Sequence, residues 1–114
     1  MTKKGRITSA DFRKFKPTAR VHGAFFSLSV APDQGGPKCA CVVSKKVSSK
    51  APVRNLLKRR CRAITVPLLK NNGQSLAFVL YAKKEAARAE FPALKKDIAD
   101  LLGRGLERGT IQHS

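Results

Sequence analysis

Acidic residues are scarce in this sequence of 114 residues, and they are unevenly placed. Asp and Glu number 7 against 24 Lys and Arg, so the formal net charge at pH 7 is +17. Between Gln34 and Lys84 there is no acidic residue at all. Such an excess of positive charge opposes a compact state unless a partner neutralises it, and the commonest such partner is nucleic acid. Because a merely solubilising surface usually mixes both signs, we favour a protein that binds a polyanion.

Long hydrophobic runs are also missing. No apolar stretch approaches the roughly 20 residues of a membrane-spanning helix, and residues 1–4 are not followed by the apolar segment of a signal peptide. We therefore expect a cytoplasmic protein. A hydrophobic content of 42% supports one modest core, and no repeat or linker divides the chain. The prediction is a single domain over 1–114, with an ordered core over about 5–103 and a tail over 104–114.

Cysteine is rare, and its number is odd. Cys39 and Cys41 are two apart on a probable strand, where side chains share a face but rarely form a bridge. Together with Cys61 we expect them to be reduced thiols, as is usual in the cytosol. The spacing lacks the Cys-x2-Cys pairs of structural zinc sites, and the available histidines are His22 and His113, the latter near the C-terminus. We favour small buried hydrophobic residues over a metal site.

The residue sets of catalytic sites are missing as well. No Ser/His/Asp or Cys/His/Asp combination can be placed, and no carboxylate pair lies within the basic stretch 45–62. Gly35 and Gly36 are followed by Pro37, which indicates a turn instead of a phosphate-binding loop. The sequence therefore predicts a binding protein without catalytic groups of its own.

Hydrophobic periodicity and turn residues predict the element order α-β-β-α-β-α, an α+β two-layer sandwich. We expect the first two strands to form a hairpin through the turn at 32–37. Prolines and a glycine set the ends of the helices. In chain order, the elements are a helix from Thr8 ended by Pro17, strands over 22–31 and 38–44, a helix from Ala51 closed by Pro67, a strand over 75–82 and a helix from Phe91 stopped by Gly103.

Alternation along the first strand predicts one buried and one wet or ligand-facing side. The buried side holds Phe26, Leu28 and Val30, and the other side holds Phe25, Ser27 and Ser29.

The main helix is amphipathic at 100° per residue. Its apolar side would pack on the sheet, while Arg60, at the edge of that side, would extend its stem toward solvent. The opposite side is cationic and gains no ion pairs along the helix, so a ligand is the better reason for it. The apolar side comprises Val53, Leu57, Cys61, Ile64 and Leu68; the cationic side comprises Asn55, Lys58, Arg59 and Arg62, with Arg54 at its flank.

At this point the sequence resembles the protein subunit of bacterial ribonuclease P. The residues that carry the resemblance are Ser-Lys-Lys at 44–46 and, seven residues later, RNLLKRRCR at 54–62. Segments 6–12 and 81–84 also resemble the family, and the likeness spans roughly 5–103. It implies an α+β fold with a left-handed β-α-β crossover through the basic helix, an exception to the usual handedness.

The resemblance also implies a function. In this family the RNA subunit removes the 5′ leader of precursor tRNA by Mg²⁺-dependent hydrolysis, and the metal is held mainly by the RNA. The protein binds the RNA subunit and the single-stranded leader, with no protein partner required. A chain without catalytic groups suits that division of labour.

The implied site residues fall into two groups. For the phenylalanines, core packing remains an alternative to base stacking. Leu56 replaces the usual second Arg of the signature and removes a bidentate phosphate contact. Lys16 and Pro17 replace a usual glycine-containing turn. The residues for the RNA subunit are Lys45, Lys46, Arg54, Asn55, Lys58, Arg59 and Arg62; those for the leader are Phe12, Phe15, Phe25, Arg13 and Lys50.

Three other functions stay open on the sequence. A ribosomal or ribosome-associated RNA-binding protein would share the size and the charge. A DNA-binding domain would use 54–62 as a recognition helix, but no second helix lies a few residues upstream. A stand-alone nuclease would need carboxylates that the basic segment lacks.

Overall fold

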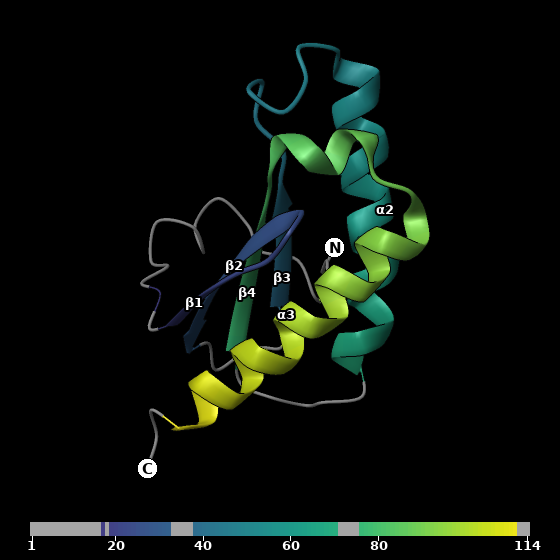
Figure 1. Cartoon of the computed structure of the whole chain (residues 1–114). Coiled ribbons are helices and arrows are strands. Elements are labelled where there is room, and N and C mark those ends of the chain that lie inside the picture. The colour runs from purple at the N-terminus through teal and green to yellow at the C-terminus, as the bar shows by residue number, and fades with distance from the viewer. Residues whose placement is uncertain (1–16, 18, 33–37, 71–75, 112–114) are drawn as a thin grey trace, which may run out of the picture.

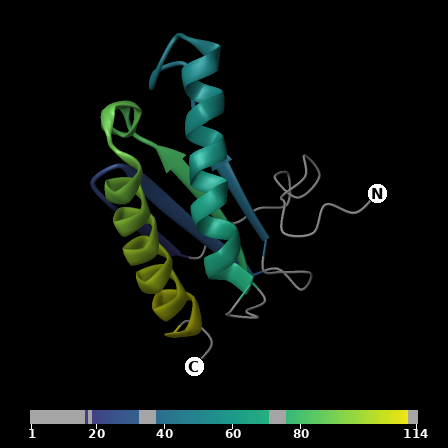
Figure 2. The same cartoon turned by 90° about the vertical axis from the view of Figure 1, so that its right-hand side faces the viewer.

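The computed structural model describes residue 17 and residues 19–32, 38–70 and 76–111. In this part of the chain, a four-stranded sheet forms one layer and two long helices form the other, as Figures 1 and 2 show. The predicted α+β two-layer architecture is therefore confirmed. The expected first helix, with Phe12, Arg13 and Phe15, lies outside the described residues. Within those residues, no helix has both the length and the apolar character needed to cross a membrane.

The strand order is β1-β2-β4-β3, with β1 at Ala19–His22, β2 at Phe26–Pro32, β3 at Lys38–Val42 and β4 at Leu76–Ala82. β4 pairs antiparallel with β2 and parallel with β3. The expected hairpin between β2 and β3 is therefore wrong, because β4 lies between them. The first five residues of β4 are all buried, and an apolar strand of this kind is most stable at the centre of a sheet.

The expected single strand over 22–31 is instead two antiparallel strands, β1 and β2, with Ala19 opposite Val30 and His22 opposite Ser27. Gly23 donates its backbone N–H to Phe26 O at 2.8 Å, which closes the turn between them. The sequence prediction missed this turn because a lone glycine in an alternating pattern is a weak turn signal.

Helix α2, at Ala51–Lys70, connects β3 to β4 and packs on the sheet by its apolar side. Leu57, Cys61 and Ile64 are buried, as predicted. The expectation that Pro67 ends the helix is wrong, because the helix continues to Lys70. Pro67 cannot donate a hydrogen bond to the carbonyl of Ala63, and its ring crowds the same group, so the disturbance is confined to one turn. Ala63 and Pro67 are both exposed, so water can satisfy that carbonyl.

Helix α3, at Phe91–Ile111, runs beside α2 on the same face of the sheet, as Figure 2 shows. A short 3-10 helix, η1 at Lys84–Arg88, precedes it and was not predicted. The expected stop at Gly103 is wrong, because the helix continues along β2. A Cβ atom added to Gly105 would lie 2.5 Å from Leu28 Cδ2 and 3.0 Å from Val30 Cγ2. Glycine therefore lets α3 approach the strand closely at this point.

The core fills the space between the two layers. Its centre consists of side chains from β2, β4 and α3. These fully or almost fully buried residues are Phe26, Leu28, Val30, Phe78, Leu80, Leu94, Ile98, Leu101 and Leu102.

A disulfide joins Cys41 of β3 to Cys61 of α2, with the Cα atoms 6.5 Å apart. The expectation of reduced thiols is therefore wrong for this pair. Cys41 points to the same side of the sheet as Cys39, toward α2, and Cys61 lies on the buried stripe of the helix. Helix packing thus brings together two sulfurs from elements that the sequence does not show to be adjacent.

Candidate nucleic-acid interface

The basic residues predicted to bind RNA gather on α2 and on the loop that precedes it. Lys45 and Lys46 are exposed in this loop, and Lys50 is exposed immediately before the helix. On the helix, Asn55, Lys58 and Arg59 are exposed, whereas Arg54 and Arg62 are half-buried. The predicted orientation of the helix is therefore confirmed, and Arg60, at the edge of the apolar side, is half-buried. We call the residues predicted to contact the RNA subunit the cationic surface: Lys45, Lys46, Arg54, Asn55, Lys58, Arg59 and Arg62.

Arg54 connects the two parts of the cationic surface. Its Nη1 donates to the carbonyl of Ser48 at 2.9 Å, so the side chain folds back over the loop. The hydroxyl of Ser48 accepts the backbone N–H of Lys50 at 3.2 Å. Since a guanidinium carries five N–H donors, this contact leaves Arg54 able to hold the loop and to bind an anion.

No acidic side chain of helix α2 would repel an anion bound on its surface. The helix contains no acidic residue, and no acidic side chain offsets the positive end of the helix dipole in its first turn. Guanidinium groups bind phosphate oxygens through paired hydrogen bonds, and the amide of Asn55 adds both a donor and an acceptor. The surface can therefore bind a phosphate backbone along about two turns of helix.

The outward side of α2 is less uniformly charged than the sequence analysis predicted. Leu56 is 41% exposed and Val66 is 37% exposed. A shallow hollow is lined by Arg59, Arg62, Ala63, Val66 and Pro67. A lining that combines apolar side chains with two arginines suits the sugar or base of a nucleotide better than a bare phosphate. The hollow was not predicted, because the helix was expected to end at Pro67, which lines it.

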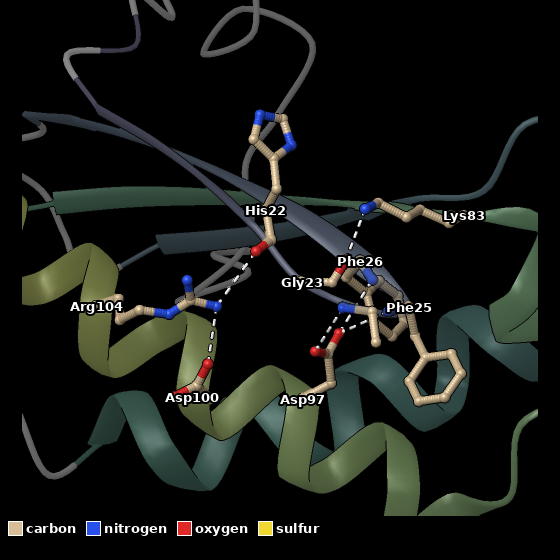
Figure 3. A network of polar contacts seen from close by, with 9 residues as sticks. His22, Gly23, Phe25, Phe26, Lys83, Asp97, Asp100 and Arg104 are labelled. Carbon is tan, nitrogen blue, oxygen red and sulfur yellow. Dashed lines mark hydrogen bonds and ion pairs between the residues drawn. The ribbon is translucent and has the colours of Figure 1, made fainter.

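The face of the sheet opposite the helices carries a second candidate surface. Across the strands, His22 is opposite Ser27, Ser27 is opposite Tyr81, and Tyr81 is opposite Val42, so these four side chains form a row. His22 is exposed, Tyr81 is 39% exposed, and His22 Nδ1 lies 3.1 Å from Ser27 Oγ. Figure 3 shows His22 pointing away from α3. We call this row the outer row.

Phe25 does not belong to the outer row. It lies in the turn before β2, is half-buried and packs against the core cluster. This position agrees with the core alternative that the sequence left open for it. The predicted alternation of the strand is wrong at two places. The turn at 23–25 interrupts it before Phe26, and Ser29, expected on the wet side, is buried like its neighbours Leu28 and Val30.

Asp97 of α3 holds this turn in place, as Figure 3 shows. Its carboxylate accepts the backbone N–H groups of Ala24, Phe25 and Phe26 at 3.0, 3.0 and 3.1 Å. Lys83 Nζ donates to Gly23 O at 2.6 Å from the other side. Asp97 was not predicted from the sequence, although it stands three residues after Leu94 and four before Leu101, on the stripe that faces the sheet.

A family model described as Ribonuclease P matches residues 1–105. A ribonuclease P protein component from Pseudanabaena is 32% identical over 97 residues, which cover 82% of this chain and 84% of the relative. A protein of the same name from Pseudarthrobacter chlorophenolicus is 32% identical over 105 residues, which cover 89% of this chain and 76% of the relative.

Solved structures show the same fold. The RNase P protein of Staphylococcus aureus is similar with a TM-score of 0.75 at 22% identity, and the match covers 89% of this chain and 94% of that one. The RNase P protein of Thermotoga maritima is similar with a TM-score of 0.62 at 24% identity, and the match covers 75% of this chain and 82% of that one. With the matched family model and the curated relatives, these observations show that the chain belongs to the ribonuclease P protein family.

Proposed function

We propose that this chain is the protein subunit of ribonuclease P and binds the catalytic RNA through the cationic surface. The observation that carries the proposal is the concentration of basic side chains, without an acidic one, on α2 and its preceding loop. This surface belongs to a chain whose family is ribonuclease P. The positive charge would be neutralised by RNA phosphates, with release of counterions.

We further propose that the outer row contributes to binding of the 5′ leader of precursor tRNA. Exposed aromatic faces stack unpaired bases with little regard to sequence. Tyr81 and His22 supply such faces on a side of the sheet that the long helices leave open. The proposal retains Phe12, Phe15, Arg13 and Lys50 as leader-binding residues, and it gives Phe25 a supporting place behind the turn.

The hydrolysis itself is assigned to the RNA subunit and its Mg²⁺. Among the described residues, no three His, Cys, Asp or Glu side chains gather where they could hold a metal ion. The part of the chain that the structure describes therefore does not fit a protein-held Mg²⁺. The proposed role of the protein is to neutralise, position and bind, in the cytoplasm, where precursor tRNA is processed.

Reconstitution tests the proposal. Purified protein should not cleave precursor tRNA alone, but should raise cleavage by the cognate ribonuclease P RNA at low Mg²⁺. A structured RNA of similar length serves as the control for non-specific binding. Cleavage by the protein without RNA would overturn the assignment of chemistry. Equal affinity for both RNAs without stimulation would favour a ribosomal or other structural RNA-binding protein.

A further inference from the structure

The disulfide encloses the part of the chain that carries the cationic surface. Cys41 and Cys61 are separated by 20 positions in the sequence. Every residue of the cationic surface lies between them, except Arg62, which directly follows Cys61. The bond therefore fixes both ends of the proposed RNA-binding segment, residues 42–60.

We propose that Cys41 and Cys61 form a reversible oxidation site, and that closing the bond holds segment 42–60 in the conformation that presents the cationic surface. The link to RNA affinity rests on the proposed function, whereas the ordering of the segment does not. Disulfides inside cells are usually transient, catalytic or redox-sensing, which favours a reversible bond over a permanent one.

The first half of this segment has little regular structure to hold it. Between β3 and α2, its hydrogen bonds include Val47 N to Ser44 O at 3.1 Å and the contacts of Ser48 with Lys50 and Arg54. The adjacent charges of Lys45 and Lys46 repel one another. A covalent closure reduces the conformations open to such a loop and stabilises the ordered one.

The unequal burial of the two cysteines indicates which thiol reacts first with an oxidant. Cys61 is fully buried, whereas Cys41 is half-buried. The Cys41 thiolate would attack one oxygen of hydrogen peroxide and break the O–O bond, giving a sulfenic acid and hydroxide. The Cys61 sulfur then displaces the sulfenic oxygen, its proton leaves with that oxygen as water, and the S–S bond forms. Two thiols lose two electrons, peroxide becomes two waters after hydroxide is protonated, and an external dithiol reverses the oxidation.

The sequence around Cys41 favours its reactivity. Nearby positive charge favours the thiolate form of a cysteine, and the stretch from Gln34 to Lys84 contains basic residues but no acidic one. Cys39 provides the matched control. It lies two residues away on the same strand and faces the same side, but it is 4% exposed and its sulfur is outside the bond.

Peptide mapping and hydrogen exchange on the full chain test the site without RNA. Peroxide treatment of reduced protein should link the Cys41 and Cys61 peptides with loss of two hydrogens, and dithiothreitol should reverse this. Amides of segment 42–60 should exchange roughly 10-fold faster after reduction, and Tm should fall by roughly 10 °C. Linkage through Cys39, or identical exchange in both states, would overturn the proposal.

Two variants separate redox control from general packing. Cys39→Ala should keep the response to peroxide, and Cys41→Ala should match the reduced wild type in both redox states. Affinity for the cognate ribonuclease P RNA should be about 3- to 10-fold lower in the reduced wild type. If RNA affinity is unchanged while exchange differs, the link to RNA binding is wrong. If neither state binds this RNA, the proposed function is wrong, and mapping and exchange still decide the oxidation site.

Discussion

Arg59 offers the most direct test of the cationic surface at the scale of one residue. It is exposed on α2 and lines the hollow beside Arg62. Arg59→Ala should weaken binding to ribonuclease P RNA by about 1–3 kcal/mol, because a charge-assisted phosphate contact is lost. Tm should stay unchanged, since the side chain supports no core contact.

Lys96→Ala is the matched control for Arg59. Lys96 is exposed on α3, outside the cationic surface. Its substitution by alanine removes one positive charge, as Arg59→Ala does. Binding should change little. Equal losses for the two variants, measured by filter binding at one salt concentration, would mean that net charge and not this helix face determines affinity.

Tyr81 tests the outer row. Tyr81→Ala should lower affinity for precursor tRNA with a leader by about 1–3 kcal/mol, the value of one aromatic–base stack. Affinity for mature tRNA should stay the same, because only the leader provides unpaired bases at this face. Phe91→Ala is the control, since Phe91 is a similarly exposed aromatic residue, at 40%, at the start of α3. An equal loss with both tRNAs would contradict leader stacking.

At the scale of elements, Asp97 connects α3 to the turn between β1 and β2. Asp97→Asn keeps the shape but removes the charge that binds three backbone N–H groups, and its NH₂ cannot accept a hydrogen bond. The free energy of unfolding should fall by about 1–3 kcal/mol in urea titrations. Asp100→Asn is the control, because Asp100 is an exposed carboxylate of the same helix and its ion-pair partner, Arg104, is four residues away on that helix. Asp100→Asn should lower the free energy of unfolding by less than about 1 kcal/mol. A loss as large as that of Asp97→Asn would mean that the charge of the helix, and not the three hydrogen bonds, stabilises the fold.

Two glycines of α3 test how closely this helix packs on β2. Gly105→Ala would place a methyl group against Leu28 and Val30 and should destabilise the fold by about 1–3 kcal/mol. Gly103→Ala meets nothing within 4 Å and should stabilise it by up to about 1 kcal/mol through helix propensity. Thermal unfolding of both variants measures the difference. The same sign for both would contradict the observed approach of α3 to the strand.

At the scale of the whole molecule, charge determines how binding depends on salt. If each of the six basic side chains of the cationic surface neutralises one phosphate, log K should fall against log salt with a slope of about −4 to −5. Affinities measured from low to physiological salt give this slope directly. A slope near −1 would mean that the net charge of +17 is not used in the complex.

Periodicity in the sequence determined which side of each long helix is buried. Leu57, Cys61 and Ile64 of α2 recur at the spacing of one helical face, and the structure buries all three. The apolar run over 75–82 likewise predicted a strand, and β4 occupies Leu76–Ala82. Local patterns such as these reflect the 3.6-residue and 2-residue repeats of the backbone, so they are readable without the fold.

The charge excess and the basic signature could likewise be recognised from the sequence, because they depend on composition and spacing alone. They led to the family that the comparisons then showed. The RNA contacts of individual residues remain predictions that the variants above address.

Only the tertiary structure decided which elements lie side by side. The position of β4 between β2 and β3 depends on the competition among all strands for the buried centre of the sheet, which no local pattern records. The same holds for the turn on Asp97, more than 70 residues away in sequence, and for the bond between Cys41 and Cys61. These features arise from packing a helix layer on a sheet, which brings distant residues into contact after the local elements have formed.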